Sequence, residues 1–258
     1  MNNKTKLLIT LFLLFQLAGY AQTLTNKIKV SDDIELIQLS PKAYVHMSVS
    51  EIQGFGKVSS NGLILVDKEK AFLFDTPVTD EQTKTLVNFI ADSLYAKVVG
   101  FVPNHWHEDC MGGLAYLNKK KIKSYANQKT IDIAKEKGLP VPKKGFKDSL
   151  FLKLNDVKID CYYLGGGHTT DNIVVWIPSE KILFAGCMVK EMSSKTPGNL
   201  SDADMNAWPS TIEKVIDKFP SEEIVIPGHG RFGGKELLTH TRDLLTEKND
   251  LDKNQNLK

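Results

Sequence analysis

The sequence lacks an excess of basic charge, and it lacks an apolar run long enough to cross a membrane. Its 258 residues include 33 Lys and Arg against 31 Asp and Glu, so the formal net charge is +2. Nucleic-acid binding usually needs a clear basic excess. The apolar run at residues 7–17 is shorter than the roughly 20 residues of a membrane-spanning helix. We therefore predict neither a nucleic-acid partner nor a membrane anchor.

Collagen-like repeats, coiled-coil heptads and low-complexity stretches are also missing. Hydrophobic residues make up 41% and charged residues 25% of the chain, which is typical of a folded protein. The length suits one large domain or two small ones. We predict a single domain over residues 22–258 that ends in a polar, frayed tail at about residues 247–258.

Residues 1–21 are predicted to be a signal peptide. Two lysines precede the apolar residues 7–17, and small residues flank Tyr20 where cleavage usually occurs. A buried N-terminal helix is the alternative interpretation. No cysteine follows the small residues, so we expect no lipid anchor at this point. The prediction is export to the periplasm.

Cysteine is scarce, and its count is odd. An exported protein usually pairs its cysteines, but this chain has only Cys110, Cys161 and Cys187. Cys161 lies in the alternating run 157–162, which predicts a strand with an inert core cysteine. The other two cysteines stand beside histidine motifs, which points to metal chemistry as another use for them.

The two halves of the chain repeat one order of elements. In the first half, a strand at 71–74 precedes a helix that begins at Thr79 and a strand at 97–102. Further strands are predicted at 27–40, 43–49 and 63–66. The second half has strands at 181–185 and 223–226 around a helix at 209–219. We predict an α/β fold with pseudo-duplicated halves and two sheets between helix layers. Unrelated halves with a chance echo are the alternative.

The second strand of each half ends at a histidine motif. His105 and His107 stand two residues apart, with Asp109 two residues further on. Imidazoles at this spacing on a loop can face one metal ion, and the carboxylate can reach a second. Ordinary surface histidines are the alternative for this motif alone.

Three more ligand-type residues follow glycines at sharp turns: His168, Cys187 and His229. The chemistry sorts all six into two groups. Three imidazoles, from His105, His107 and His168, suit a zinc ion with an open fourth position. Asp109, Cys187 and His229 suit a second zinc ion. Two such three-ligand sites indicate catalysis rather than a structural metal. His46 and His240 lie outside the motifs and are predicted to be structural.

This ligand pattern resembles the metallo-β-lactamase superfamily, which implies an αββα sandwich of two mixed sheets flanked by helices. Within it, the chain is similar to class B β-lactamases of the first, di-zinc subclass. Other hydrolases of the superfamily usually have His where this chain has Cys110, and a bridging Asp where it has Cys187. His105 excludes the single-zinc subclass, which has Asn there. The resemblance covers about residues 28–246.

The resemblance also implies roles for residues that are unremarkable by themselves. Lys190 would bind the substrate carboxylate, although alone it reads as a solvated surface charge. Asn199 would lie near the lactam carbonyl, although alone it reads as a turn residue. Phe55, between two glycines in the polar stretch 51–62, would lie on a mobile flap over the substrate; an ordinary hairpin is the alternative. Asp109 would assist catalysis. Asp75 is interpreted either as a support for a ligand histidine or as a turn cap.

The implied activity is zinc-dependent hydrolysis of the β-lactam amide bond in penicillins, cephalosporins and carbapenems, which confers antibiotic resistance. Two zinc ions are the expected cofactors, and a small-molecule β-lactam is the expected partner of a monomeric enzyme. One alternative is a hydrolase of the same fold that acts on a thioester or lactone. The other is a non-catalytic periplasmic zinc-binding protein.

Overall fold

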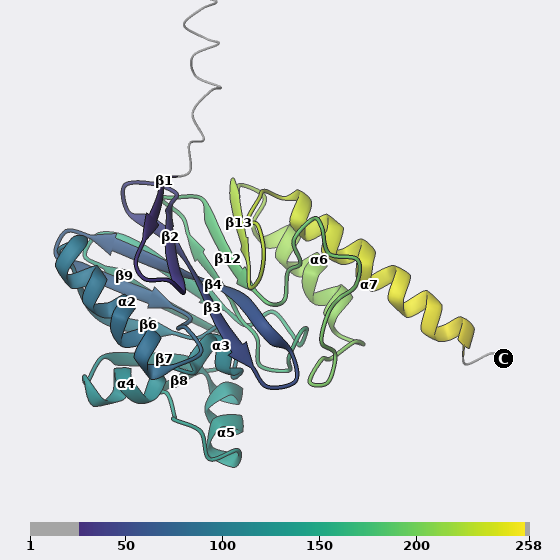
Figure 1. Ribbon diagram of the computed structural model, residues 1–258. Helices are drawn as coiled ribbons and strands as arrows, with labels where there is room; N and C mark the ends of the chain where they lie inside the picture. Colours follow the sequence, from purple (N-terminus) through teal and green to yellow (C-terminus); the bar gives the residue numbers. More distant parts are fainter. Residues whose placement is uncertain (1–25, 256–258) are drawn as a thin grey trace, which may run out of the picture.

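Two mixed β-sheets lie face to face in the computed structural model, which describes residues 26–255 and the side chains of residues 27–248 (Figure 1). The first sheet has eight strands in chain order: β1 (Asn26–Lys29), β2 (Ile34–Gln38), β3 (Ala43–Ile52), β4 (Gly56–Asp67), β5 (Lys70–Phe74), β6 (Lys97–Val102), β7 (Lys123–Asn127) and β8 (Lys144–Phe146). The second has the order β13 (Ile224–Pro227), β12 (Ile182–Gly186), β11 (Val174–Ile177), β10 (Val157–Tyr162) and β9 (Ser149–Leu154).

Helices cover the outer face of each sheet. The helices are α2 (Asp80–Ser93), α3 (Glu108–Met111), α4 (Leu114–Lys119), α5 (Gln128–Glu136), α6 (Trp208–Lys218) and α7 (Glu236–Gln255). The central core joins the inner faces of the sheets through residues such as Leu65 and Phe184. A second core, around Leu73 and Leu86, joins the first sheet to α2. A third, around Trp208 and Val225, joins the second sheet to α6 and α7. The predicted αββα sandwich is confirmed.

Each half contains a parallel pair of strands joined by a helix. In the first half, β5 and β6 are parallel and α2 connects them. In the second half, β12 and β13 are parallel and α6 connects them. Helix α2 begins where the sequence predicts it, because the Thr79 side chain accepts a hydrogen bond from the Gln82 backbone at 3.1 Å. The predicted echo of strand, helix and strand is therefore present.

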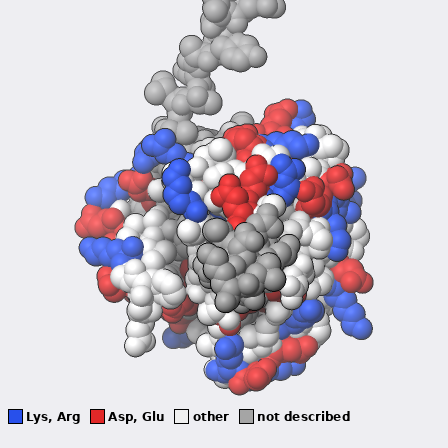
Figure 2. Space-filling model, turned by 90° about the vertical axis from the view of Figure 1, so that its right-hand side faces the viewer, with Lys and Arg blue, Asp and Glu red and all other residues white. Residues whose placement is uncertain are grey.

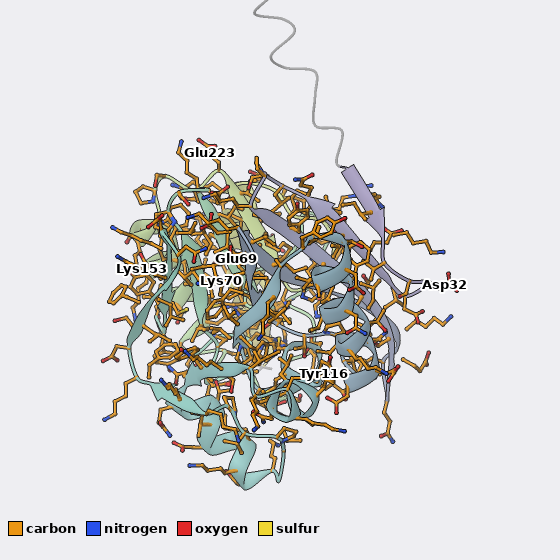
Figure 3. The ribbon with its side chains drawn as sticks, turned by 90° about the vertical axis from the view of Figure 1, so that its left-hand side faces the viewer. Asp32, Glu69, Lys70, Tyr116, Lys153 and Glu223 are labelled. Atoms are coloured by element: carbon orange, nitrogen blue, oxygen red, sulfur yellow. The ribbon has the colours of Figure 1, made fainter. Side chains whose placement is uncertain are left out.

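Some predicted boundaries are wrong. The strand predicted at 27–40 is two strands, since the polar residues 31–33 form a turn between β1 and β2. The strand predicted at 63–66 already begins at Gly56, so most of residues 51–62 lie in a long hairpin of β3 and β4. Helix α7 continues to Gln255, so residues 247–255 of the expected frayed tail are helical. Glu69 and Lys70, labelled in Figure 3, lie where the chain passes from β4 to β5. The predicted signal peptide lies outside the described residues.

Candidate metal centre

Five of the six candidate metal ligands follow strand ends, and the sixth begins a short helix. Strand β6 ends at Val102, and the loop after it carries His105 and His107. His107 is the residue before α3, and Asp109 lies in the first turn of that helix. The acidic side chains of Glu108 and Asp109 in the first turn favour a helix start there, because they face the positive end of the helix dipole. The loop and α3 thus aim three ligands at one place.

Three imidazoles meet edge to face. The ring centroids of His105 and His107 are 4.6 Å apart, and those of His105 and His168 are 5.0 Å apart. Their nearest ring nitrogens all lie within 4.8 Å of one another. Burial lowers the pKa of His105 to about 3 and lowers that of His168 well below its usual value. These imidazoles are therefore neutral at pH 7, which is the form that binds a metal ion.

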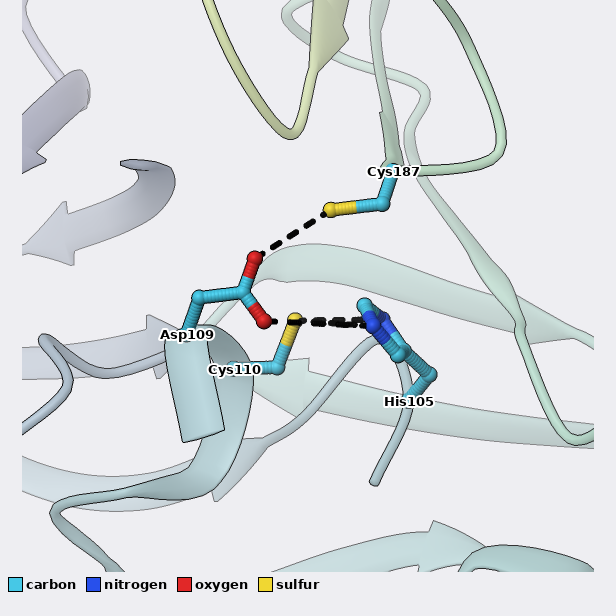
Figure 4. A group of neighbouring side chains, drawn as sticks. All are labelled: His105, Asp109, Cys110 and Cys187. Atoms are coloured by element: carbon cyan, nitrogen blue, oxygen red, sulfur yellow. Dashed lines mark hydrogen bonds and ion pairs between the residues drawn. The ribbon is translucent and has the colours of Figure 1, made fainter. Parts of the chain in front are cut away.

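The second ligand group is equally close. The Asp109 carboxylate lies 3.5 Å from the Cys187 sulfur and 3.2 Å from His229 Nε2. The Cys187 sulfur lies 3.3 Å from the same His229 nitrogen. Figure 4 shows Asp109 and Cys187 pointing toward each other, with His105 beside them. The structure thus brings together all six residues that the sequence selects, and it also places the Cys110 sulfur 3.1 Å from His105 Nδ1, next to Asp109 and Cys187.

The charges of the second group suit a divalent cation. Burial alone would raise the pKa of Asp109, but the hydrogen bond from His229 and the nearby imidazoles hold it well below its usual range. A hydrogen bond from Cys110 lowers the pKa of the Cys187 thiol to about 6. Burial lowers the pKa of His229, but the adjacent thiolate and carboxylate raise it well above its usual value. Two anionic donors and an imidazole at such distances are a donor set that zinc prefers.

Hydrogen bonds to the far nitrogen fix two of the imidazoles. His107 Nε2 donates to the Asp202 carboxylate at 3.0 Å, so its Nδ1 faces the other ligands. His229 Nδ1 donates to the Ser59 carbonyl at 2.8 Å, which leaves Nε2 for Asp109 and Cys187. Such partners orient metal-binding histidines and make them more basic. The donor set and its supports therefore fit zinc ions in both groups.

Asn61 holds the loop of His229. Its side-chain amide donates to the carbonyls of Pro227 and Gly230, at 3.0 and 2.8 Å. Its backbone N–H donates to the Gly228 carbonyl at 2.8 Å. Nothing in the local sequence singles out Asn61, which lies in the stretch 51–62 predicted to be a flap. Asp202 is also missed; its position three residues after Asn199 is the signal that could have found it.

The loop packs tightly at Gly228. A Cβ atom there would lie 2.2 Å from the Cys187 sulfur and 2.6 Å from its backbone nitrogen. Only glycine allows the His229 turn to approach Cys187 this closely.

Asp75 supports the ligand loop through the backbone. Its carboxylate accepts a hydrogen bond from the Asn104 N–H, directly before His105. The residue is buried and has φ of +58°, and burial raises the pKa of its carboxyl group. Of the two interpretations from sequence, the structure therefore favours a backbone cap. His46 and His240 donate to backbone carbonyls of Asp75 and Ser194, as expected of structural histidines.

Of the three proposed substrate residues, the structure places Lys190 beside the ligands. Lys190 lies close enough to His105 and His168 to lower the pKa of both. Its ammonium group is 5.4 Å from the centre of the Trp208 ring. It is also 3.5 Å from the point where a Cβ atom on Gly198 would lie. The adjacent Asn199 accepts a hydrogen bond from the Ser201 N–H at 3.1 Å, which closes a turn. Phe55 is 61% exposed at the tip of the β3–β4 hairpin.

The comparisons with known proteins agree with this site. A family model described as the metallo-beta-lactamase superfamily matches residues 102–229. A metallo-beta-lactamase type 2 from Bacteroides fragilis is 55% identical over 239 residues, 93% of this chain and 95% of that protein. The chain belongs to the metallo-β-lactamase superfamily. A metallo-beta-lactamase type 2 from Bacillus cereus is 37% identical over 82% of each chain.

Solved structures agree with this assignment. The crystal structure of VMB-1 matches with a TM-score of 0.81 and 36% identity, over 84% of this chain and 99% of that one. TMB-1 matches with a TM-score of 0.81 and 38% identity, over 85% of this chain and all of that one. Both the resemblance seen in the sequence and the prediction of a zinc-dependent β-lactam hydrolase are confirmed.

Proposed function

We propose that each of the two ligand groups holds one zinc ion. With both ions bound, the protein opens the β-lactam ring of penicillins, cephalosporins and carbapenems. The observation that carries this proposal is the pair of ligand groups with Lys190 beside them. A protein that only stores zinc has no use for a half-buried cation next to its metal ligands. A substrate carboxylate would give that cation a partner.

The metal ligands and Asp109 have separate roles in the proposed reaction. When bound, zinc acts as a Lewis acid on the lactam carbonyl and lowers the pKa of the attacking water. His105, His107 and His168 would hold one ion, and Asp109, Cys187 and His229 would hold the other. The carboxylate of Asp109 stays ionised, so it can accept a hydrogen bond from the water and orient it.

The substrate is held by groups at the rim. Lys190 would bind the carboxylate of the β-lactam by a charge-assisted hydrogen bond. The side-chain amide of Asn199 would donate to the lactam carbonyl as negative charge develops there. Phe55 would cover an apolar substituent, because its exposed ring lies at a hairpin tip between Gly54 and Gly56, which both have positive φ.

The test is hydrolysis of a chromogenic cephalosporin by the zinc-loaded protein, with metal counting and with thioester and lactone panels. We expect turnover of the cephalosporin that is lost with chelator and restored by zinc, with two ions bound at full activity. Faster turnover of a thioester or lactone would indicate the other hydrolase. Stoichiometric zinc without any turnover would indicate a zinc-binding protein.

Export and resistance follow from the same proposal. The structure describes no helix long and apolar enough to cross a membrane within residues 26–255. We propose that residues 1–21 direct the chain to the periplasm, where it acts as a monomer. Mature protein from a periplasmic extract should begin at Gln22, and expression should raise the β-lactam concentration that stops growth.

A further inference from the structure

The even overall charge of the chain hides a strongly basic region. Residues 119–147 contain ten lysines and two acidic residues, Asp132 and Glu136, so this segment carries a net charge of +8. The whole chain carries +2, and the remaining residues therefore carry −6. The segment includes the end of α4, strand β7, helix α5 and strand β8, which lie together at the lower left of Figure 1. We call this region the lysine lobe.

The lysines of this lobe are exposed and lack acidic partners. All ten are exposed to solvent. None of them forms an ion pair with a carboxylate within residues 27–248, whereas lysines elsewhere pair with acids, such as Lys42 with Asp67. On the side of α6 and α7, by contrast, basic and acidic side chains alternate (Figure 2). Lysine charges that gather without nearby acidic charges create a positive surface potential. The lobe therefore attracts an anionic surface.

Four lysines of the lobe surround one hollow. Lys121, Lys123, Lys143 and Lys144 line it, and its volume is about 270 Å³. They come from the turn after α4, from β7, and from the segment that enters β8. The side chain of Ile122 adds an apolar wall. A hollow with ammonium groups and an apolar wall suits an amphipathic anion better than a free inorganic ion. Lysine stems can pack against the apolar surface while their charges stay in water.

The choice of lysine indicates the kind of partner. The chain has only two arginines, Arg231 and Arg242, and the lobe has none. A site that selects one phosphate usually uses arginine, whose planar group binds phosphate through two parallel hydrogen bonds. Lysines act as separate point charges, and each lysine near an anionic bilayer adds about the same small attraction. Four of the ten lysines lie over aromatic rings, but none has a carboxylate partner among the described side chains. Many lysines without acidic partners therefore fit a charged surface rather than a single anion.

We propose that the lysine lobe docks on the surface of an anionic phospholipid bilayer, which makes the protein a peripheral, salt-sensitive membrane binder. Phosphate head groups would enter the hollow between Lys121 and Lys144, and the other lysines would face the lipid surface around it. The attraction is electrostatic, so no anchor or inserted helix is needed. It is also separate from hydrolysis, because none of these lysines belongs to the metal centre.

The experiment is co-sedimentation of the zinc-loaded protein with vesicles. Vesicles that contain phosphatidylglycerol should retain the protein at low salt, and vesicles of phosphatidylcholine alone should not. Retention should fall as salt is added, because ions screen exposed charges. The test variant carries Lys121→Gln, Lys123→Gln, Lys143→Gln and Lys144→Gln. Each loss of about 1 kcal/mol corresponds to about fivefold, so we expect at least a tenfold fall in partitioning.

The control variant removes the same charge elsewhere. It carries Lys68→Gln, Lys97→Gln, Lys153→Gln and Lys158→Gln, four lysines that are also exposed and have no ion pair within the described side chains. It should keep most of the binding, and both variants should hydrolyse the chromogenic cephalosporin at the normal rate. Equal losses in both variants, or no retention of the unaltered protein at low salt, would overturn the proposal. So would release from the vesicles by inorganic phosphate at constant ionic strength, which would assign the hollow to a soluble anion.

Discussion

Replacing Lys190 with alanine tests how the cleft recognises its substrate. Lys190 is half-buried beside the histidine ligands, and this burial lowers the pKa of its ammonium group. A hydrogen bond between charged groups contributes about 1.5–3 kcal/mol, so its loss should raise KM by about 10- to 150-fold. The effect should appear mainly in KM, because the contact with the carboxylate exists before and during the reaction.

The assay compares two substrates on two enzymes. One substrate is a chromogenic cephalosporin with its free carboxylate, and the other is its methyl ester. Lys190→Ala should raise KM strongly for the acid and little for the ester. The difference between the two effects isolates the pairing between ammonium and carboxylate, as in a double-mutant cycle.

A structural role must be separated from a binding role. The Lys190 ammonium lies over the Trp208 ring at 5.4 Å, and such a contact is worth about 0.5–1 kcal/mol when exposed and about 2 kcal/mol when desolvated. Because Lys190 is half-buried, Lys190→Ala should lower the free energy of unfolding by no more than about 2 kcal/mol. An unchanged KM for the free acid, or an equal rise for acid and ester, would refute the assignment.

Four further outcomes follow from the structure. EDTA should abolish turnover and zinc should restore it, while inhibitors that acylate serine should have no effect; activity in a metal-free preparation would contradict this. Asn61→Ala removes both bonds to the His229 loop and should cost about 1–3 kcal/mol of stability, with weaker binding of the second zinc ion, measured by denaturation and by zinc titration. After zinc removal, oxidised glutathione should join Cys110 to Cys187, whose sulfurs lie within 4.8 Å, and zinc should then restore activity only together with a reductant; Cys110→Ser should recover with zinc alone, and unchanged thiol counts would refute the reaction. Burial lowers the pKa of His46 to about 4, so between pH 6.5 and pH 4 this histidine is protonated in the unfolded state but not in the folded state. The free energy of unfolding should therefore fall by up to about 3 kcal/mol over this range. His46→Gln should make that fall smaller.

The ligands could be predicted because their chemistry is visible locally. Metal-binding side chains must be histidine, cysteine or acidic residues, and the turns that aim them need glycine. Gly228 shows the reason, since any side chain there would collide with Cys187. Parallel strands joined by a helix bring their carboxyl ends to one sheet edge, so the repeated order of elements also predicted that the motifs would meet. The fold layers followed from the same alternation of strands and helices.

The supports could not be predicted in the same way. Asn61 reaches Pro227 across 166 positions of sequence, and its amide is chemically ordinary. Asp202 acts on His107 from 95 positions away. Neither residue type is diagnostic, and only the sandwich of two sheets decides which loops face each other. The turn that splits the predicted strand at 27–40 differs, because Ser31, Asp32 and Asp33 are typical turn residues and do carry a local signal.

Net charge is a poor guide to surfaces, since a sum over the chain removes the positions of the charges. The total of +2 excludes a protein that is basic throughout, yet it is compatible with a lobe of +8 set against a remainder of −6. Screening over about 8 Å at physiological salt means that a partner senses only the charges near its contact. A bilayer facing residues 119–147 would therefore be attracted by the lysines there and would scarcely feel acidic residues that lie farther than this from the contact. The same argument explains how a protein without a membrane-spanning helix in its described residues can still have a face for membranes.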